Sequence, residues 1–370
     1  MISPSTFPAT DKIELRVNGL LHSGWKTASV QTAIDSLASS FDLTLSDKWP
    51  SDDVEAVVEA GPALEQISVE AGASCEILIG GEVLISGYID DVDPDLSGED
   101  HSIRIAGRSK AADLIDCSAV HSPGSWNGRR LEDIVATLIA PFGLTVTAAI
   151  STGEAFKTFA LQPGETVFAA IERMCKMRGL LPISDASGNI IIMRPQIGGS
   201  AVRIEQGKHF TAANARHSVA NRFSQIIVKG QAAGDDDHNG RAVSQVRGEA
   251  KDAAVQRHRP LIIISEDQAN IASLNERAAW EVKVRAAQEQ GADITLPGWR
   301  DPAGALWRHG NTVDLYAPAL FITDKMIIAS VNYQIGDDGS VTTLSLAYPD
   351  AYAELPTPEA KVSKIERKRA

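Results

Sequence analysis

The sequence predicts a β-rich α+β protein of several domains, in which two small β-barrel modules are separated by α/β material. Three observations support this fold class. The chain has 370 residues, which is long for a single hydrophobic core. Polar and apolar residues alternate with the period of a β-strand in two separate regions, 12–108 and 292–350. Between these regions, apolar residues recur at the spacing of an α-helix.

Residues 1–108 are predicted to form the first β-barrel module. Its clearest element is a hairpin over residues 75–90, in which Gly80 and Gly81 supply the positive φ angles that a two-residue turn needs. The other predicted strands are shorter and end at turn residues, as in a small barrel or sandwich. They cover residues 12–19, 41–46 and 101–107.

Residues 109–204 are predicted to form an α/β domain. The strongest helix pattern runs from Glu165 to Arg178, with Gly179 as its C-cap. Two shorter helices are expected at 110–116 and 131–139, and a hairpin is expected over 180–193.

The second β-barrel module is predicted from two pieces, 205–235 and 292–350. A helical insertion at 236–291 separates them, because an Ala- and Glu-rich segment from about 267 to 290 favours a long helix. Residues 351–370 contain two prolines and several basic residues, which is typical of an exposed basic tail.

The charge is distributed unevenly along the chain. The net charge is −13, and residues 1–108 carry all of it, with 19 acidic and 6 basic residues. Such a surface repels nucleic acid, although a plain solubility charge explains it equally well. No apolar run approaches the roughly 20 residues that span a bilayer, and the N-terminus lacks a secretory signal. These features predict synthesis in a cytoplasm and no membrane binding by this chain.

No segment carries a specific signature of catalysis, a cofactor or a metal site. Asp91, Asp93 and Asp95 alternate as in a calcium loop, but a proline interrupts them and the glycine of that loop is missing. Residues 235–238 (Asp-Asp-Asp-His) offer possible cation ligands on a loop, where neighbouring side chains point in opposite directions. Cys75 and Cys175 stand among apolar residues and are interpreted as buried hydrophobes. We therefore assign no catalytic, cofactor-binding or metal-binding residue and no cofactor.

Several short motifs, taken in order, resemble one family. They are Gly24-Trp25, the Gly-Tyr-Ile-Asp of 87–90, a segment from Gly107 to Ser118, the Gln-Pro-Gly-Glu-Thr-Val-Phe of 162–168, and a segment from Glu172 to Leu181. This pattern is similar to the Mu-like phage baseplate hub proteins, also called the tail protein P family, over roughly residues 10–350. The residues that carry the resemblance are Gly24, Trp25, Gly87, Asp90, Gly107, Arg108, Asp113, Gly164, Glu165 and Arg173.

The resemblance implies a structural hub of a contractile phage tail and no enzymatic activity. It implies a homotrimer in which two tail-tube-like modules per chain alternate around a pseudo-six-fold ring, which joins the tail tube protein to the central spike protein. The expected partners are these two proteins, other baseplate proteins and sibling chains, and DNA is expected to pass through without being bound. The chain would reside in the virion baseplate, after assembly in the host cytoplasm.

The resemblance also suggests roles for particular residues. The glycines would serve turns and close packing, and Arg108, Asp113 and Arg173 would form ion pairs that position helices. The acidic residues of 1–108 would make a negative lumen, unless they point outward or into subunit contacts. Two alternatives stay open: a cell-wall (peptidoglycan) hydrolase of the tail tip, and the hub of a headless tail-like bacteriocin. A surface binding module is disfavoured by the missing export signal.

Overall fold

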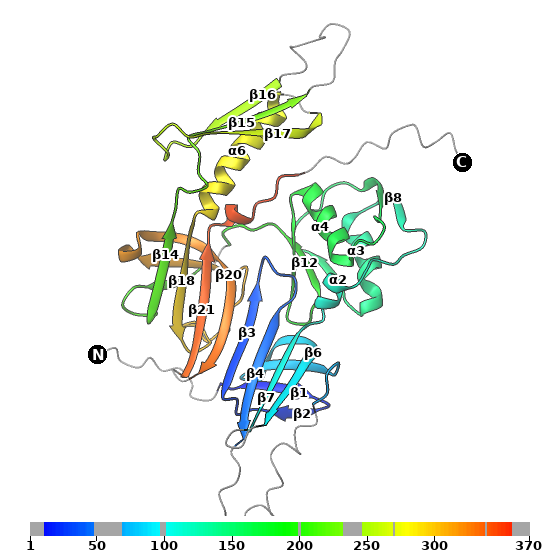
Figure 1. Cartoon of the computed structure of the whole chain (residues 1–370), viewed down its shortest axis with the longest axis vertical. Coiled ribbons are helices and arrows are strands. Elements are labelled where there is room, and N and C mark those ends of the chain that lie inside the picture. The colour runs from blue at the N-terminus through cyan, green and yellow to red at the C-terminus, as the bar shows by residue number, and fades with distance from the viewer. Residues whose placement is uncertain are drawn as a thin grey trace, which may run out of the picture.

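The computed structural model describes residues 11–47, 69–96, 101–198, 201–231, 246–268, 271–336 and 339–356. Figure 1 shows a long sheet, a helical unit beside it, and a small sheet with one long helix at the far end. The protein is β-rich with several sheets, which confirms the predicted fold class.

The first module contains seven strands in the order β3-β4-β7-β6-β5-β1-β2. The strand β6 bends, so that its first half pairs with β5 and its second half pairs with β7, with a register shift between Ile89 and Asp91. The strand bounds are β1 (Ile13–Val17), β2 (Leu20–His22), β3 (Thr27–Ala33), β4 (Ser40–Asp47), β5 (Ser74–Ile79), β6 (Glu82–Leu96) and β7 (His101–Ser109).

The second module repeats this topology. Its strands follow one another in the sheet in the order β14-β18-β21-β20-β19-β13. In the same positions the first module has β3-β4-β7-β6-β5-β1, and the strands at matching positions also occur in the same order along the chain. The long strand β20 bends as β6 does, with a register shift between Ile328 and Ser330. One difference is that β13 pairs with β19 in parallel, whereas β1 and β5 are antiparallel. The bounds are β13 (Val202–Glu205), β14 (Ala212–His217), β18 (Gln290–Pro297), β19 (Thr312–Ala317), β20 (Ile322–Gly336) and β21 (Gly339–Ala347).

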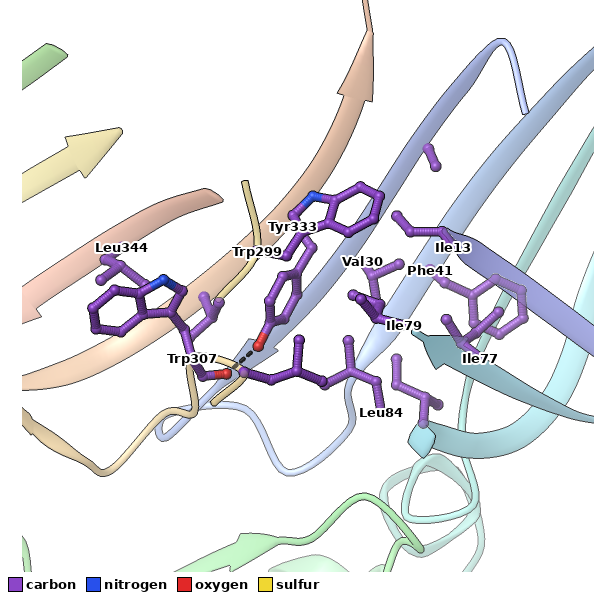
Figure 2. Packing of buried hydrophobic residues seen from close by; sticks show 14 of the residues in the cluster. Ile13, Val30, Phe41, Ile77, Ile79, Leu84, Trp299, Trp307, Tyr333 and Leu344 are labelled. Atoms are coloured by element: carbon purple, nitrogen blue, oxygen red, sulfur yellow. Dashed lines mark hydrogen bonds between the residues drawn. The ribbon is translucent and has the colours of Figure 1, made fainter. Parts of the chain in front are cut away.

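The two modules share one sheet and one core. Residues 330–335 of β20 pair antiparallel with residues 28–33 of β3. Buried residues of both modules form a single cluster, in which Val30 lies between Phe41 of its own module and Tyr333 of the other (Figure 2). The Tyr333 hydroxyl donates a hydrogen bond to the Trp307 carbonyl, so this buried polar group is satisfied.

The two predicted β-barrel modules are present as strand-rich units, but no pairing among the described residues closes either of them into a barrel. The reason is that β3 and β20 use their edges to pair with each other. Their pairing protects these two strand edges from uncontrolled association.

The α/β domain packs its helices around a separate core. Thr166 begins α4 (Val167–Arg178) by accepting a hydrogen bond from the Ala169 amide, and Gly179 ends it at φ +64°. Leu114, Ile134, Ile171 and Met174 are buried within this core. The other elements are α2 (Ala112–Asp116), β8 (Ser125–Arg129), α3 (Leu131–Ile139), η2 (Ala140–Phe142), β9 (Val146–Ala148), β10 (Phe156–Ala160), β11 (Leu181–Ser184) and β12 (Ile190–Met193).

The predicted helical insertion differs from the structure. The strand β15 (Gln225–Gln231), assigned from sequence to the second module, pairs instead with β16 (Val246–Lys251) and β17 (Pro260–Gln268). The helix α6 (Ile271–Gln288) covers one face of this small sheet, burying Ile226, Val228 and Leu274. Strand periodicity identifies strands but not their partners, which explains the misassignment.

The start of the predicted exposed tail is packed. Within η4 (Pro349–Tyr352), Asp350 lies 2.8 Å from the Lys283 ammonium, and the Trp280 indole donates to the Ala353 carbonyl at 3.1 Å. This segment therefore ties α6 to the main sheet, and the basic residues after 356 lie outside the described residues.

Candidate functional site: a polar sheet face and its free edges

Eight strands form one continuous antiparallel layer, β14-β18-β21-β20-β3-β4-β7-β6. One face packs on the core, and the other carries polar side chains because strand residues alternate between faces. Hydrogen bonds link this polar face across strands, including Ser29 to Asn332 at 3.0 Å and Ser345 to Asp293 at 2.7 Å. Other members of the face are Asp42, Thr44, Asp91, Asp93, Arg104, Asn214, Thr295, Gln334 and Thr343.

Charge on this face is compensated only in part within the first module, where one arginine stands beside two of the carboxylates. Arg104 binds Asp42 and lies 3.0 Å from Asp93. Elsewhere in the module, Glu76 pairs with Arg16 at 2.6 Å, on the part of the sheet formed by β1 and β5. The described acidic residues of 1–108 are therefore spread over several surfaces rather than gathered on one.

The layer ends in two free edges. The strand β14 pairs only with β18, and the second half of β6 pairs only with β7, within the described part of the chain. Figure 1 shows these two strands at opposite ends of the layer. Unpaired strand edges expose backbone donors and acceptors that can recruit a further strand.

The glycines that carry the resemblance fall into two structural kinds. Gly87 and Gly107 lie where β6 and β7 approach closely: an added Cβ would lie 1.9 Å from the Arg108 carbonyl oxygen and 2.2 Å from that of Tyr88, respectively. Gly24 and Gly164 have φ angles of +92° and +79°, which favour glycine, and have open space around them. Trp25 is buried, and its indole nitrogen donates to the Ile13 carbonyl at 3.0 Å.

The charged residues of the motif form two local groups. Arg108 lies 2.7 Å from Asp90 and 2.9 Å from Asp116, and these hydrogen bonds raise the pKa of Arg108. Its helical partner is thus Asp116, and the Asp113 backbone carbonyl instead accepts from the Cys117 amide at the end of α2.

Glu165 and Arg173 form the second group. Arg173 binds the half-buried Glu165 carboxylate at 2.8 Å and lies over the Phe159 ring, 4.3 Å from its centroid. The Glu165 carboxylate also accepts from the Gln162 amide at 2.6 Å, so it anchors the loop before α4.

Sequence reasoning missed two residues at domain junctions. Arg300 reaches from the second module to Asp11 (2.6 Å) and Glu82 (2.5 Å) of the first. His309 has a buried Nδ1 atom beside β11 of the α/β domain, and burial lowers its pKa to about 4. No sequence pattern marks either residue, because each one contacts residues that are far away along the chain.

Chemistry-bearing clusters are sparse in the described ranges. These contain no group of three His, Cys, Asp or Glu residues arranged to hold a metal, and residues 235–238 lie outside them. Cys75 and Cys175 are buried as predicted, and burial raises the pKa of each thiol to about 12. Among the helices described, none is long and apolar enough to cross a membrane.

Four family models match successive parts of the chain. They describe the N-terminal domain of a Mu phage GpP-like baseplate assembly protein (residues 12–109), the second domain of a gp44-like baseplate hub protein (111–194), the third domain of an NMB1110-like tail protein (222–280) and the fourth domain of the Mu GpP protein (270–355).

Whole-chain comparisons agree with these matches. The baseplate hub protein gp44 of Escherichia phage Mu is 32% identical over 347 residues, covering 91% of this chain and 88% of that protein. The 43 kDa tail protein of prophage MuSo2 from Shewanella oneidensis has a similar structure, with a TM-score of 0.81 and 29% identity over 93% of this chain and all of that one. A tail protein from Neisseria meningitidis matches with a TM-score of 0.73 and 22% identity, covering 92% and 99% of the two chains. The chain therefore belongs to the Mu-like phage baseplate hub family.

Proposed function

We propose that this baseplate hub protein forms a homotrimeric ring in which the two β modules of each chain alternate, giving six similar positions. The observation that carries this proposal is the repeated topology of the modules, including the bent strands β6 and β20. Equivalent modules can occupy equivalent positions around an axis, and heterologous contacts close into a ring when the rotation fits. Three chains would then meet a six-fold tail tube on one side and a three-fold spike on the other.

The partners proposed for the ring are the tail tube protein, the central spike and other baseplate proteins. One supporting likeness, in fold alone, is to a type VI secretion component whose own description reports similarity to the phage T4 tail proteins gp27 and gp5 (TM-score 0.53, 11% identity). The hub would be built in the host cytoplasm and act in the contractile tail through shape and assembly, without catalysis.

The polar face of the eight-strand layer is proposed to line the channel through which DNA passes. Hydroxyl and amide side chains stand there among carboxylates, and Arg104 is engaged by two of these carboxylates. Stable DNA binding requires cationic groups that displace counterions from phosphate, so such a lining would hold DNA weakly. The expected negative lumen would thus be a polar face on which carboxylates outnumber arginines among the described residues.

The proposal is tested by measuring the mass of the purified protein by light scattering, alone and with its spike protein. A particle of three times 39.5 kDa supports the ring. A monomer that persists at high concentration in both conditions contradicts it. A DNA-binding titration at low salt accompanies this measurement, and tight binding would contradict the proposed channel lining.

A further inference from the structure

We propose that neighbouring copies join by antiparallel pairing of the second half of β6 in one copy with β14 in the next, with Asp93 opposite Arg216. This inference rests on the proposed ring and specifies which surfaces form it. It concerns a second copy of this chain as the partner.

The contact between modules within the chain supplies the template. There, the second half of the bent strand β20 pairs with β3, the first strand of the other module's layer. In the repeated topology, β6 corresponds to β20 and β14 corresponds to β3. The same kind of contact is therefore available between β6 and β14, and these are the two edges of the layer that the described residues leave free.

The register follows from the pairings within each module. Each bent strand has one extra residue, and pairing resumes at Asp91 in β6 and at Ser330 in β20. These two residues therefore correspond, and two positions further on Asp93 corresponds to Asn332. Asp42 and Asp293 occupy equivalent places in β4 and β18, which makes Ser29 correspond to Asn214 and Gln31 to Arg216.

Within the chain, Asn332 pairs with Gln31 and Gln334 pairs with Ser29. Transferring this register places Asp93 opposite Arg216 and Asp95 opposite Asn214 of the next copy. Opposite charges directly across two strands stabilise a pair, whereas like charges oppose it.

The two side chains are suited to an added partner. The Arg216 side chain is 67% exposed, and its contact to Glu289 is long, at 3.4 Å. The Asp93 side chain is 62% exposed and meets Arg104 from within its own chain at 3.0 Å. A carboxylate accepts more than one hydrogen bond, so Asp93 can bind both arginines.

Strand direction is also consistent. The layer holds eight strands that alternate in direction, so β6 and β14 run opposite ways and a junction between copies continues the antiparallel order. Pro94 removes one backbone donor from β6, which weakens pairing with any strand, β14 included, so that backbone pairing alone drives association less strongly. The charge pair then gives the junction selectivity.

Disulfide trapping tests this register directly. In a Cys117→Ser background, which removes the exposed cysteine, Asp93→Cys is combined with Arg216→Cys. Directly opposite strand residues lie within the range that a disulfide bridges. We expect mild oxidation to give linked dimers and trimers in non-reducing gels. Asp93→Cys with Lys325→Cys, which lies in the first half of β20 away from both edges, is the matched control and should stay unlinked.

A charge reversal gives a second readout. Arg216→Glu should raise the protein concentration at half-assembly by about tenfold, which for a closed trimer corresponds to roughly 0.9 kcal/mol at each of its three junctions. Lys325→Glu, which makes the same change of charge on an exposed strand position, should leave it unchanged. Circular dichroism checks that both variants are folded.

The outcomes separate this inference from the proposed function. Trimers that link through 93 and 216 support both. The junction between β6 and β14 is overturned if the protein is a trimer by mass but forms no disulfide at any of the three cysteine pairs 93 with 216, 91 with 218 and 95 with 214. That result leaves the ring intact. If the protein stays monomeric with and without the spike, the ring and the junction both fall.

Discussion

Gly87→Ala should disrupt the bend of β6, on which both the first module and the proposed junction depend. Gly87 is paired on both sides, with Cys75 of β5 and with Ser109 of β7. A Cβ at this position would lie 1.9 Å from the Arg108 carbonyl oxygen and 2.8 Å from the Ser109 Cα. These are backbone atoms of a paired strand, so a rotamer change cannot relieve the contact.

The cost follows from this geometry. Relief requires β6 and β7 to separate, which breaks ladder hydrogen bonds and loosens the core beneath them. Forcing an extra carbon into a packed region typically costs 1–3 kcal/mol, and the lack of a flexible neighbour places this site at about 3 kcal/mol. Gly336→Ala is the matched control, because it lies near the end of β20 with open space where a Cβ would stand. Its effect should stay within about 0.5 kcal/mol.

Thermal unfolding followed by circular dichroism in the β-sheet band, together with urea titration, compares the two variants. The account predicts a clear loss of stability for Gly87→Ala and almost none for Gly336→Ala. Equal stability of the two variants would refute the inference that the β6–β7 approach requires a glycine.

Three further perturbations test other contacts. Arg173→Ala leaves the half-buried Glu165 carboxylate without its arginine partner and should destabilise the α/β domain by about 2 kcal/mol in urea titration. Lys176→Ala, in an exposed ion pair, is the control and should change the stability by under about 0.5 kcal/mol. Arg300→Ala removes the ion pairs between the modules and should increase amide hydrogen exchange at the β5–β6 turn; unchanged exchange would contradict that role. His309 is neutral when folded, with a pKa of about 4, so the unfolded chain binds the proton more tightly. Stability should be unaffected above pH 6.5 and fall by up to about 3 kcal/mol as the pH drops to 4, and His309→Gln should flatten that part of the profile.

Local elements were predictable because their causes are local. The Gly80-Gly81 turn is present between β5 and β6, with φ angles of +57° and +81°. Helix α4 ends at Gly179 as its sequence indicates, because a left-handed C-cap favours glycine at that position.

Pairing between distant strands was not predictable. The contact of β3 with β20 joins residues about three hundred positions apart, and alternation of polar and apolar residues does not identify a partner strand. The same limit explains the misplaced strand β15. Gly248 held a usable signal, since an added Cβ there would lie 2.3 Å from the Leu274 backbone, but a glycine alone does not reveal which helix approaches.

The site was predictable only in part. The motif glycines mark close approaches and turns, but the sequence does not indicate that Arg108 pairs with Asp116 of α2. The two modules repeat each other in strand order and register. Their amino-acid sequences show no matching pattern, so the repeat is visible only in the structure.

Electron microscopy of the purified hub with its spike most directly tests whether the repeated modules tile a ring. We expect end-on averages of an annulus with an open centre, six similar densities and three-fold symmetry. Averages of a compact particle without a central opening, or with only three modules around the axis, would contradict the account.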